Sequence, residues 1–167
     1  MPEPNWLELV LRWAHILAAI TAMGGTIFAR FAVVPVLAGL PEEQRRTLHE
    51  AIRARWAKFV HGSIAVLLAT GLYNFMFVIR AKFTLPPAYH MIFGIKFLVA
   101  MILFFFASVL FGRSALAQKF RQNAKLWLTV NLALATTIVC LSGYLRALPH
   151  TPKAPADQVA PVDVKAP

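Results

Sequence analysis

Four long apolar runs constrain what this chain can fold into more than any other feature of its sequence. A helix of about 20 apolar residues crosses the hydrocarbon core of a bilayer, and each run reaches that length. With 59% hydrophobic residues and a mean hydropathy of +0.62, the chain has more apolar surface than a water-soluble domain of 167 residues can bury. The sequence therefore predicts an all-α integral membrane protein, a four-helix transmembrane bundle with spans at 13–37, 59–79, 89–111 and 126–145.

The basic residues are distributed unevenly between the two sides of this predicted bundle. Six lie on one side and ten on the other, apart from Lys96 within the third run. The larger group comprises Arg30, Arg45, Arg46, Arg53, Arg55, Lys58, Arg113, Lys119, Arg121 and Lys125. Cytoplasmic loops carry the excess of Lys and Arg, so the split predicts a multi-pass protein of a bacterial inner membrane with both termini periplasmic. This topology explains the net charge of +10 without a nucleic-acid partner. It also predicts that anionic lipid binds at the cytoplasmic basic face.

Two segments are predicted to lie outside the spans. Pro41 followed by two acids is typical of a helix start, and the basic stretch 44–59 after it predicts a cytoplasmic amphipathic helix between spans 1 and 2. From 149 to 167 the chain is rich in Pro and Ala, which predicts a disordered periplasmic tail. Residues 1–148 then form a single four-span membrane domain, with no room for a second folded domain.

Several small and polar residues within the spans predict how the helices pack. His15, Ala19, Ala22 and Thr26 follow one face of the first span, and Gly24-Gly25 would let a neighbouring helix or a cofactor approach closely. Pro35 is predicted to kink or end that helix. In the fourth span, polar side chains suit hydrogen bonds between helices; they are Asn131, Thr136, Thr137 and Ser142.

Lys96 is the one charge deep inside the third run, about two turns from its start. An ammonium at that depth costs about 1–3 kcal/mol, so it either extends towards the headgroups or finds a partner inside the bundle. The predicted topology puts His15, His90 and Lys96 in the same outer half of the membrane and His61 near the inner face. Two histidines at similar depth, such as His15 and His90, are able to hold a haem between helices, whereas His15 and His61 are not. His15 has a simpler interpretation as well, as a packing histidine bonded to a hydroxyl or a carbonyl.

Copper is the other candidate ligand, because copper(I) prefers thioether, thiolate and imidazole groups. Met23, Met91 and Met101 are available beside His15 and His90, but the methionines do not follow one helix face and suit core filling instead. The single cysteine, Cys140, provides no thiol cluster. The chain also lacks the GxGxxG, P-loop and HExxH motifs, which favours a binding or transport protein over an enzyme.

Several motifs carry a resemblance to known families. Trp13 and His15 followed by Gly24-Gly25, then Thr70-Gly71-Leu72, then Phe93 to Lys96 make residues 6–113 resemble the copper resistance protein D (CopD-like) membrane domain. His15, Gly25, Arg30 and Lys96 are also similar to the pattern of HemJ-type protoporphyrinogen oxidases, although Ala107 stands where that pattern has a histidine.

The first resemblance implies copper handling or transport through an outer-half site. There His15 and His90 would be the metal ligands, and Lys96 a polar element of the same site. The second implies a b-type haem-binding redox protein, in which His15, Lys96 and His90 are the candidate cofactor-binding residues. The third interpretation is a ligand-free structural or assembly protein, and a homo-oligomer or a membrane partner fits each of the three.

Overall fold

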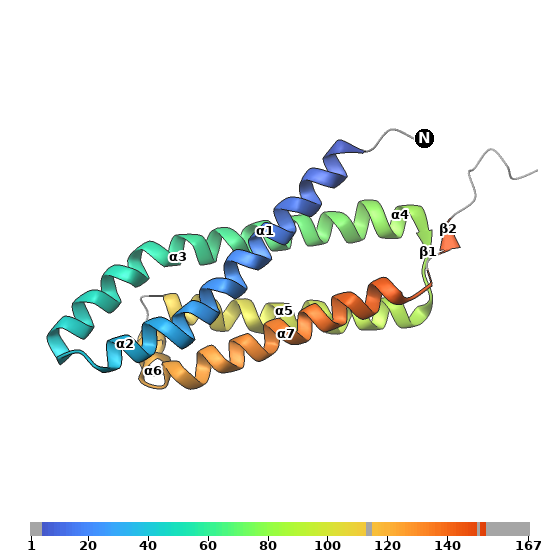
Figure 1. Cartoon of the computed structure of the whole chain (residues 1–167). Helices are drawn as coiled ribbons and strands as arrows, with labels where there is room; N and C mark the ends of the chain where they lie inside the picture. Colours follow the sequence, from blue (N-terminus) through green and yellow to red (C-terminus); the bar gives the residue numbers. More distant parts are fainter. Residues whose placement is uncertain (1–4, 113–114, 150, 153–167) are drawn as a thin grey trace, which may run out of the picture.

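Four long helical stretches run alongside one another through the molecule (Figure 1). The structure, a computed structural model, describes residues 5–112, 115–149 and 151–152. Each stretch is long and apolar enough to cross a membrane, and the four are Trp6–Ala38, Glu42–Lys82, Pro87–Phe111 and Ala124–Ala147. The predicted set of four apolar helices is therefore confirmed.

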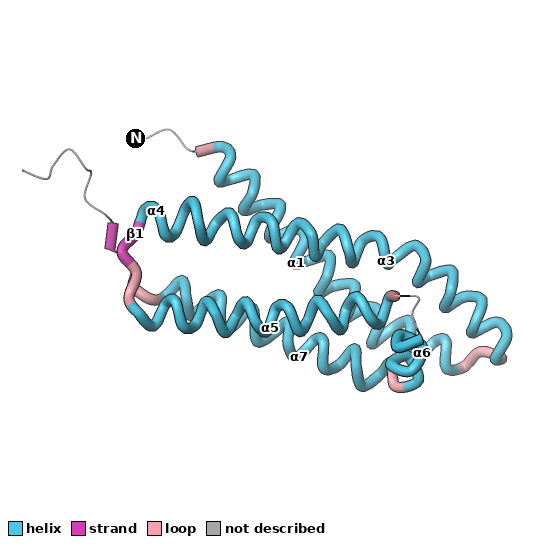
Figure 2. The backbone as a smooth tube through the Cα atoms, turned by 180° about the vertical axis from the view of Figure 1, so that it is seen from behind, coloured by secondary structure: helices cyan, strands magenta, loops and turns pink. Residues whose placement is uncertain are grey.

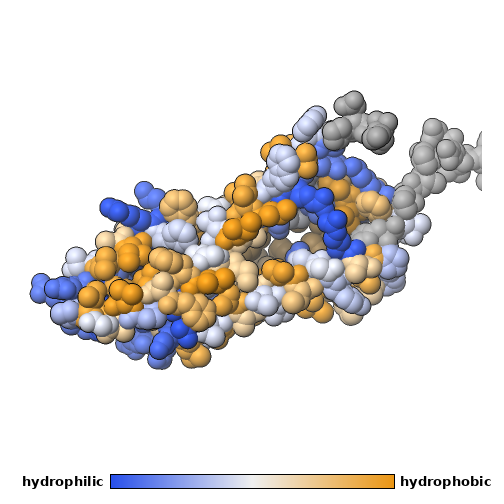
Figure 3. All heavy atoms as spheres, in the orientation of Figure 1, coloured by the Kyte–Doolittle hydropathy of each residue, from blue (hydrophilic) through white to orange (hydrophobic). Residues whose placement is uncertain are grey.

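The outer surface of these helices is apolar along most of its length. Phe28 and Met91 are each 64% exposed and Leu17 is 63% exposed. In the space-filling view, hydrophobic side chains spread along the helices, and hydrophilic ones gather towards the ends (Figure 3). Exposed apolar surface on this scale is unfavourable in water and favourable against lipid tails, so the surface agrees with the membrane class that helix length indicates.

The first stretch consists of α1 (Trp6–Phe28), a π-helical segment η1 (Ala29–Val33) and α2 (Val34–Ala38). Asn5 caps α1 by accepting a hydrogen bond from the amide of Glu8. Pro35 has no amide hydrogen, and its ring would clash with the carbonyl four residues earlier in a regular α-helix. The π-helical turn accommodates the proline, so the helix continues beyond Pro35 to Ala38.

The second stretch consists of α3 (Glu42–Tyr73), a second π-helical segment η2 (Asn74–Ile79) and α4 (Arg80–Lys82). The prediction of a separate amphipathic surface helix is wrong, because α3 passes from its charged first turns into the apolar run without a break. No proline or glycine interrupts residues 42–61, which are rich in helix-favouring Glu, Gln, Arg and Ala. The 41 residues from Glu42 to Lys82 extend about 60 Å, roughly twice the thickness of a hydrocarbon core.

The remaining helices are α5 (Pro87–Phe111), α6 (Ala115–Gln122) and α7 (Ala124–Ala147). The four long helices contact one another in the cyclic order α1, α3, α5 and α7, and the closest pairs are α1 with α3 and α5 with α7. The tube view shows α5 and α7 side by side, with α6 folded back near the end of α5 (Figure 2). The helices therefore enclose a common interior into which polar side chains of each can point.

Two polar contacts join α7 to neighbouring segments. The Asn131 side chain of α7 is 3% exposed and donates to the Leu103 carbonyl of α5 at 3.1 Å. Arg30 of η1 donates from Nε to the Thr129 hydroxyl of α7 at 2.8 Å. The prediction for Asn131 is confirmed. The other three residues of that prediction differ, because each donates to a carbonyl of its own helix; they are Thr136, Thr137 and Ser142.

Gly25 allows α1 to pack tightly against Trp56 of α3. A Cβ atom at Gly25 would lie 2.0 Å from Cζ2 of Trp56, so the indole ring occupies the space that any side chain there would need. At Gly24 a Cβ atom would meet nothing within 4 Å. The sequence predicted a close approach at this glycine pair, and the structure identifies Gly25 as the point of contact and Trp56 as its neighbour.

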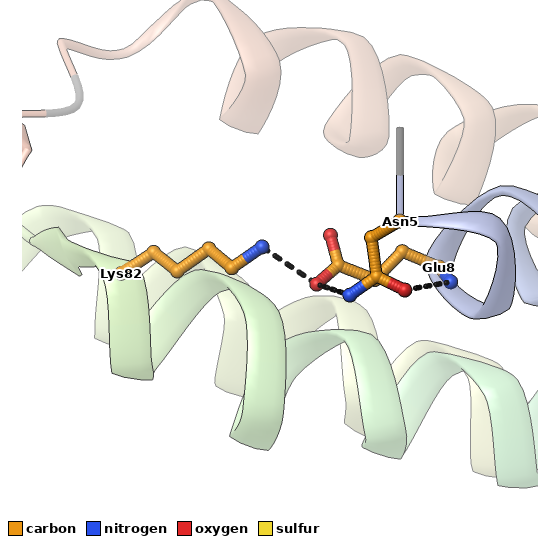
Figure 4. A network of polar contacts seen from close by, with 3 residues as sticks. All are labelled: Asn5, Glu8 and Lys82. Carbon is orange, nitrogen blue, oxygen red and sulfur yellow. Dashed lines mark hydrogen bonds and ion pairs between the residues drawn. The ribbon is translucent and has the colours of Figure 1, made fainter. Parts of the chain in front are cut away.

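The bundle has two unlike ends. One end carries α2, the first turns of α3 and α6, and we refer to it as the α2–α6 end. The opposite, α4–β1 end carries the start of α1, the end of α7, α4 and β1 (Phe83–Thr84) (Figure 1). There Lys82 pairs with Glu8 at 2.6 Å, and Asn5 also donates to Glu8 at 2.9 Å (Figure 4).

A short ladder joins β1 to the segment after α7. Thr84 pairs with Thr151 and Phe83 with Pro152 of β2 (Thr151–Pro152), in antiparallel register. The predicted disordered tail began at 149, so its first residues include this strand, and residues 150 and 153–167 lie outside the described part of the chain. The ladder joins the connection between the second and third long stretches to the chain that follows the fourth.

Candidate functional site

Three polar side chains from three helices meet inside the bundle. His15 of α1 and Thr70 of α3 are joined by a hydrogen bond of 2.7 Å between Nδ1 and Oγ1. Lys96 of α5 lies within electrostatic reach of His15. Thr70 is buried, and the other two are half-buried. We refer to His15, Thr70 and Lys96 as the His15 cluster.

The hydrogen bonds of Thr70 fix the tautomer of the His15 ring. The Thr70 hydroxyl donates its one hydrogen to the Val66 carbonyl at 2.6 Å, so its oxygen accepts from His15. The hydrogen of a neutral His15 ring is then on Nδ1, and Nε2 keeps a free lone pair. Histidines that bind metals have this arrangement, with one ring nitrogen donating to a protein oxygen and the other free to coordinate. A packing histidine would use the same bond, so the bond permits ligation without requiring it.

Gly71 lets the His15 ring lie directly against α3. A Cβ atom at this position would be 3.3 Å from Cε1 and 3.9 Å from Nδ1 of His15. Such a contact is tighter than ordinary van der Waals packing, so a larger residue would push the ring away from Thr70. The Thr-Gly pair thus supplies both the acceptor and the space for the imidazole.

Lys96 has no carboxylate partner among the residues that the structure describes. The four described glutamates lie elsewhere. Glu8 pairs with Lys82, and the first turns of α3 hold Glu42, Glu43 and Glu50. A half-buried ammonium without a carboxylate in an apolar span is costly. The structure places Lys96 within electrostatic reach of His15, and their membership of one site stays a prediction.

His90 and His61 lie apart from this cluster. His90 contacts Phe75 edge-on, with ring centroids 6.3 Å apart, and lines a hollow of about 590 Å³ at the α4–β1 end together with Arg80. His61 is exposed and donates from Nδ1 to the Ala57 carbonyl of its own helix at 2.7 Å. The cluster therefore holds two of the three predicted site residues, His15 and Lys96, and the pairing of His15 with His90 stays a prediction.

Thr70 is the member of the cluster to which the sequence assigned no role. The Thr-Gly dipeptide at 70–71 is visible as a motif, but nothing near it in the sequence indicates that it faces His15, 55 positions away. Across residues 5–112, 115–149 and 151–152, no three His, Cys, Asp or Glu side chains are grouped in a way that could hold a metal ion. What the cluster offers is one imidazole with a free Nε2, flanked by a cation.

Neither a family model, nor a curated protein, nor a solved structure matches this chain. The resemblances to the CopD-like and HemJ-type families therefore stay predictions from sequence. A function for the His15 cluster has to be argued from its own chemistry.

Proposed function

We propose that this protein is a membrane haem b protein with a redox function, in which Nε2 of His15 is the ligand to the iron. The observation that carries the proposal is the His15 ring, held through Nδ1 by Thr70 at 2.7 Å, with the charge of Lys96 within electrostatic reach. An ammonium repels a bare metal cation and attracts an anion, and haem b carries two carboxylates. A cation next to a free imidazole nitrogen therefore suits haem better than a copper ion.

Copper handling, to which the CopD-like resemblance points, is supported less well by the cluster. Copper(I) sites are built from several soft ligands, and here a single imidazole stands next to a positive charge. Cys140 is exposed on α7 and does not join the cluster. Haem iron takes at most one imidazole on each face of the ring. A single histidine such as His15 is therefore sufficient to bind one face.

Each member of the cluster has a separate role in this proposal. His15 would hold the iron, Thr70 keeps the ring in the Nδ1–H tautomer, and Lys96 would supply the positive charge for a haem carboxylate. Haem supplies one-electron chemistry, and its potential depends on the axial ligand, hydrogen bonding and burial. The surrounding lipid-facing helices keep water away, which strengthens the pairing of Lys96 with a carboxylate.

A visible spectrum and a metal analysis of the same purified sample test the proposal. The full chain is expressed in cells supplied with a haem precursor and purified in mild detergent. We expect a Soret band, bands in the visible region that sharpen on reduction, and iron rather than copper in the metal analysis. Stoichiometric copper with no Soret band would contradict the proposal and support the copper interpretation.

We further propose that the α2–α6 end faces the cytoplasm of a bacterial inner membrane and that both termini face the periplasm. The supporting observation is the concentration of basic residues at that end, which the positive-inside rule assigns to the cytoplasm. Fusions of alkaline phosphatase to the C-terminus are expected to be active, and fusions of a cytoplasm-specific reporter inactive. A fusion within the connection at 39–41 gives the matched control, with the opposite pattern. The reverse result at the two positions would contradict this orientation.

A further inference from the structure

A basic hollow lies between α3 and α5 at the α2–α6 end. It has a volume of about 430 Å³, and its polar lining consists of Arg53, Lys58 and His61 from one side of α3. Phe111 and Gly112, where α5 ends, also line the hollow. No acidic side chain is among the described residues that line the hollow, so its charge is positive.

Two guanidinium groups converge at the edge of this hollow. Arg53 donates from Nη1 to the Gly112 carbonyl at 2.8 Å, and Arg121 of α6 donates from Nη1 to the same oxygen at 2.8 Å. A guanidinium has five N–H donors, so each group keeps donors for a further acceptor. The shared carbonyl holds both groups in place before any ligand arrives.

The two like charges repel each other at this position. Burial, together with the neighbouring Arg53 guanidinium, lowers the pKa of Arg121 from its usual value, and the Glu50 carboxylate acts in the opposite direction. His49 also interacts electrostatically with both arginines. An anion placed between these groups would relieve the repulsion and accept charge-assisted hydrogen bonds.

The depth of the hollow corresponds to the headgroup region of a bilayer. It lies where the charged first half of α3 meets the apolar run that begins near Phe59, and Phe59 is 58% exposed and stacks on Trp56 at 5.3 Å. Aromatic side chains gather at this level in membrane proteins, and basic pockets between spanning helices bind lipid headgroups. We infer that this hollow binds a phosphate group, supplied by the headgroup of an anionic lipid, through Arg53 and Lys58 with Arg121 beside them.

Binding of phosphatidylglycerol to the purified full chain in phosphatidylcholine nanodiscs tests the inference. The double variant Arg53→Gln/Lys58→Gln is expected to bind this lipid about tenfold more weakly, because two charge-assisted contacts are lost. The control is Arg46→Gln/Arg55→Gln, which removes the same charge from exposed positions of the same helix. Equal weakening in the control would overturn the inference, since it would indicate a diffuse attraction.

Two further arms complete the experiment. Lys58→Gln alone leaves the contact of Arg53 with Gly112 intact, so it reports on the hollow even if the double variant is poorly folded, and no loss of binding in this variant would also contradict the inference. Inorganic phosphate is added to nanodiscs of phosphatidylcholine alone. Thermal stabilisation by phosphate without any response to phosphatidylglycerol would assign the phosphate site to a soluble ligand, and stabilisation by neither would overturn it.

Discussion

Replacing His15 by alanine is expected to reduce the proposed haem binding to background. The ring offers the free Nε2 of the cluster, whereas Lys96 as an ammonium has no lone pair and a Thr hydroxyl is not among the usual haem ligands. The fold should survive, because His15 is only half-buried and its one side-chain hydrogen bond is to Thr70. The measurement is the haem-to-protein ratio of the purified variant, together with its circular dichroism.

The control for this experiment is His49→Ala. His49 lies on the charged first half of α3, far along that helix from Thr70, so the variant should keep the haem content of the unaltered protein. Equal haem loss in the two variants would show that the ligand is held elsewhere. A fully loaded His15→Ala variant would contradict the proposed site directly.

Lys96→Met and Thr70→Val extend the same measurement to the other two members of the cluster. Methionine keeps the apolar stem of Lys96 and removes its charge. A hydrogen bond to a charged group contributes about 1.5–3 kcal/mol, which corresponds to about tenfold or more in affinity. If Lys96 merely extends towards the headgroups, Lys96→Met will bind haem fully.

Removing the Thr70 acceptor in Thr70→Val should weaken haem binding by about tenfold, as with other groups that orient a ligating histidine.

The second large effect is expected at Gly25. In Gly25→Ala the new methyl group would overlap the Trp56 indole, whereas in Gly24→Ala it enters open space. Alanine raises helix propensity by about 0.5–1 kcal/mol at either position, so the difference between the two variants isolates the overlap. Overpacking of this kind costs about 1–3 kcal/mol. We expect Gly25→Ala to be less stable than Gly24→Ala by that amount in equilibrium unfolding in mixed detergent micelles.

The contact with Trp56 is tested by a double-mutant cycle. In a Trp56→Ala background the indole is gone, and Gly25→Ala should then behave like Gly24→Ala. If the penalty at Gly25 persists without the indole, the overlap with Trp56 is not its cause. Each variant is compared by its free energy of unfolding and by the elution volume of the folded protein.

The four helices are predictable because the signal that specifies them is local. Length and hydropathy within each run are sufficient, and the structure has a helix for each run. The breaks between helices are less predictable. Residues 42–61 contain no helix breaker. The charged stretch that suggested a separate surface helix therefore forms the first half of α3 and continues directly into the apolar run. At Pro35 a π-helical turn removes the clash that a regular α-helix would have.

The site was predictable in depth but not in rotation. Along α5, His90 and Lys96 both lie in the half of the bundle that also holds His15, and hydropathy alone indicates this. Six positions along a helix, however, separate two side chains by about 120° around its axis. That rotation directs Lys96 to His15 and His90 to the hollow beside Phe75. The rotation of each helix depends on packing between distant segments, which no single run encodes.

The two π-helical segments, Ala29–Val33 and Asn74–Ile79, have a consequence for how the length of this chain can vary. Inserting or deleting one residue in a regular α-helix turns everything beyond it by about 100°, which would move a cluster residue away from its neighbours. A π-helical turn already contains one residue more than an α-helical turn. A single-residue deletion within Asn74–Ile79 would therefore convert that segment to regular helix, whereas at Ala29–Val33 the extra residue also accommodates Pro35 and its deletion would restore the clash.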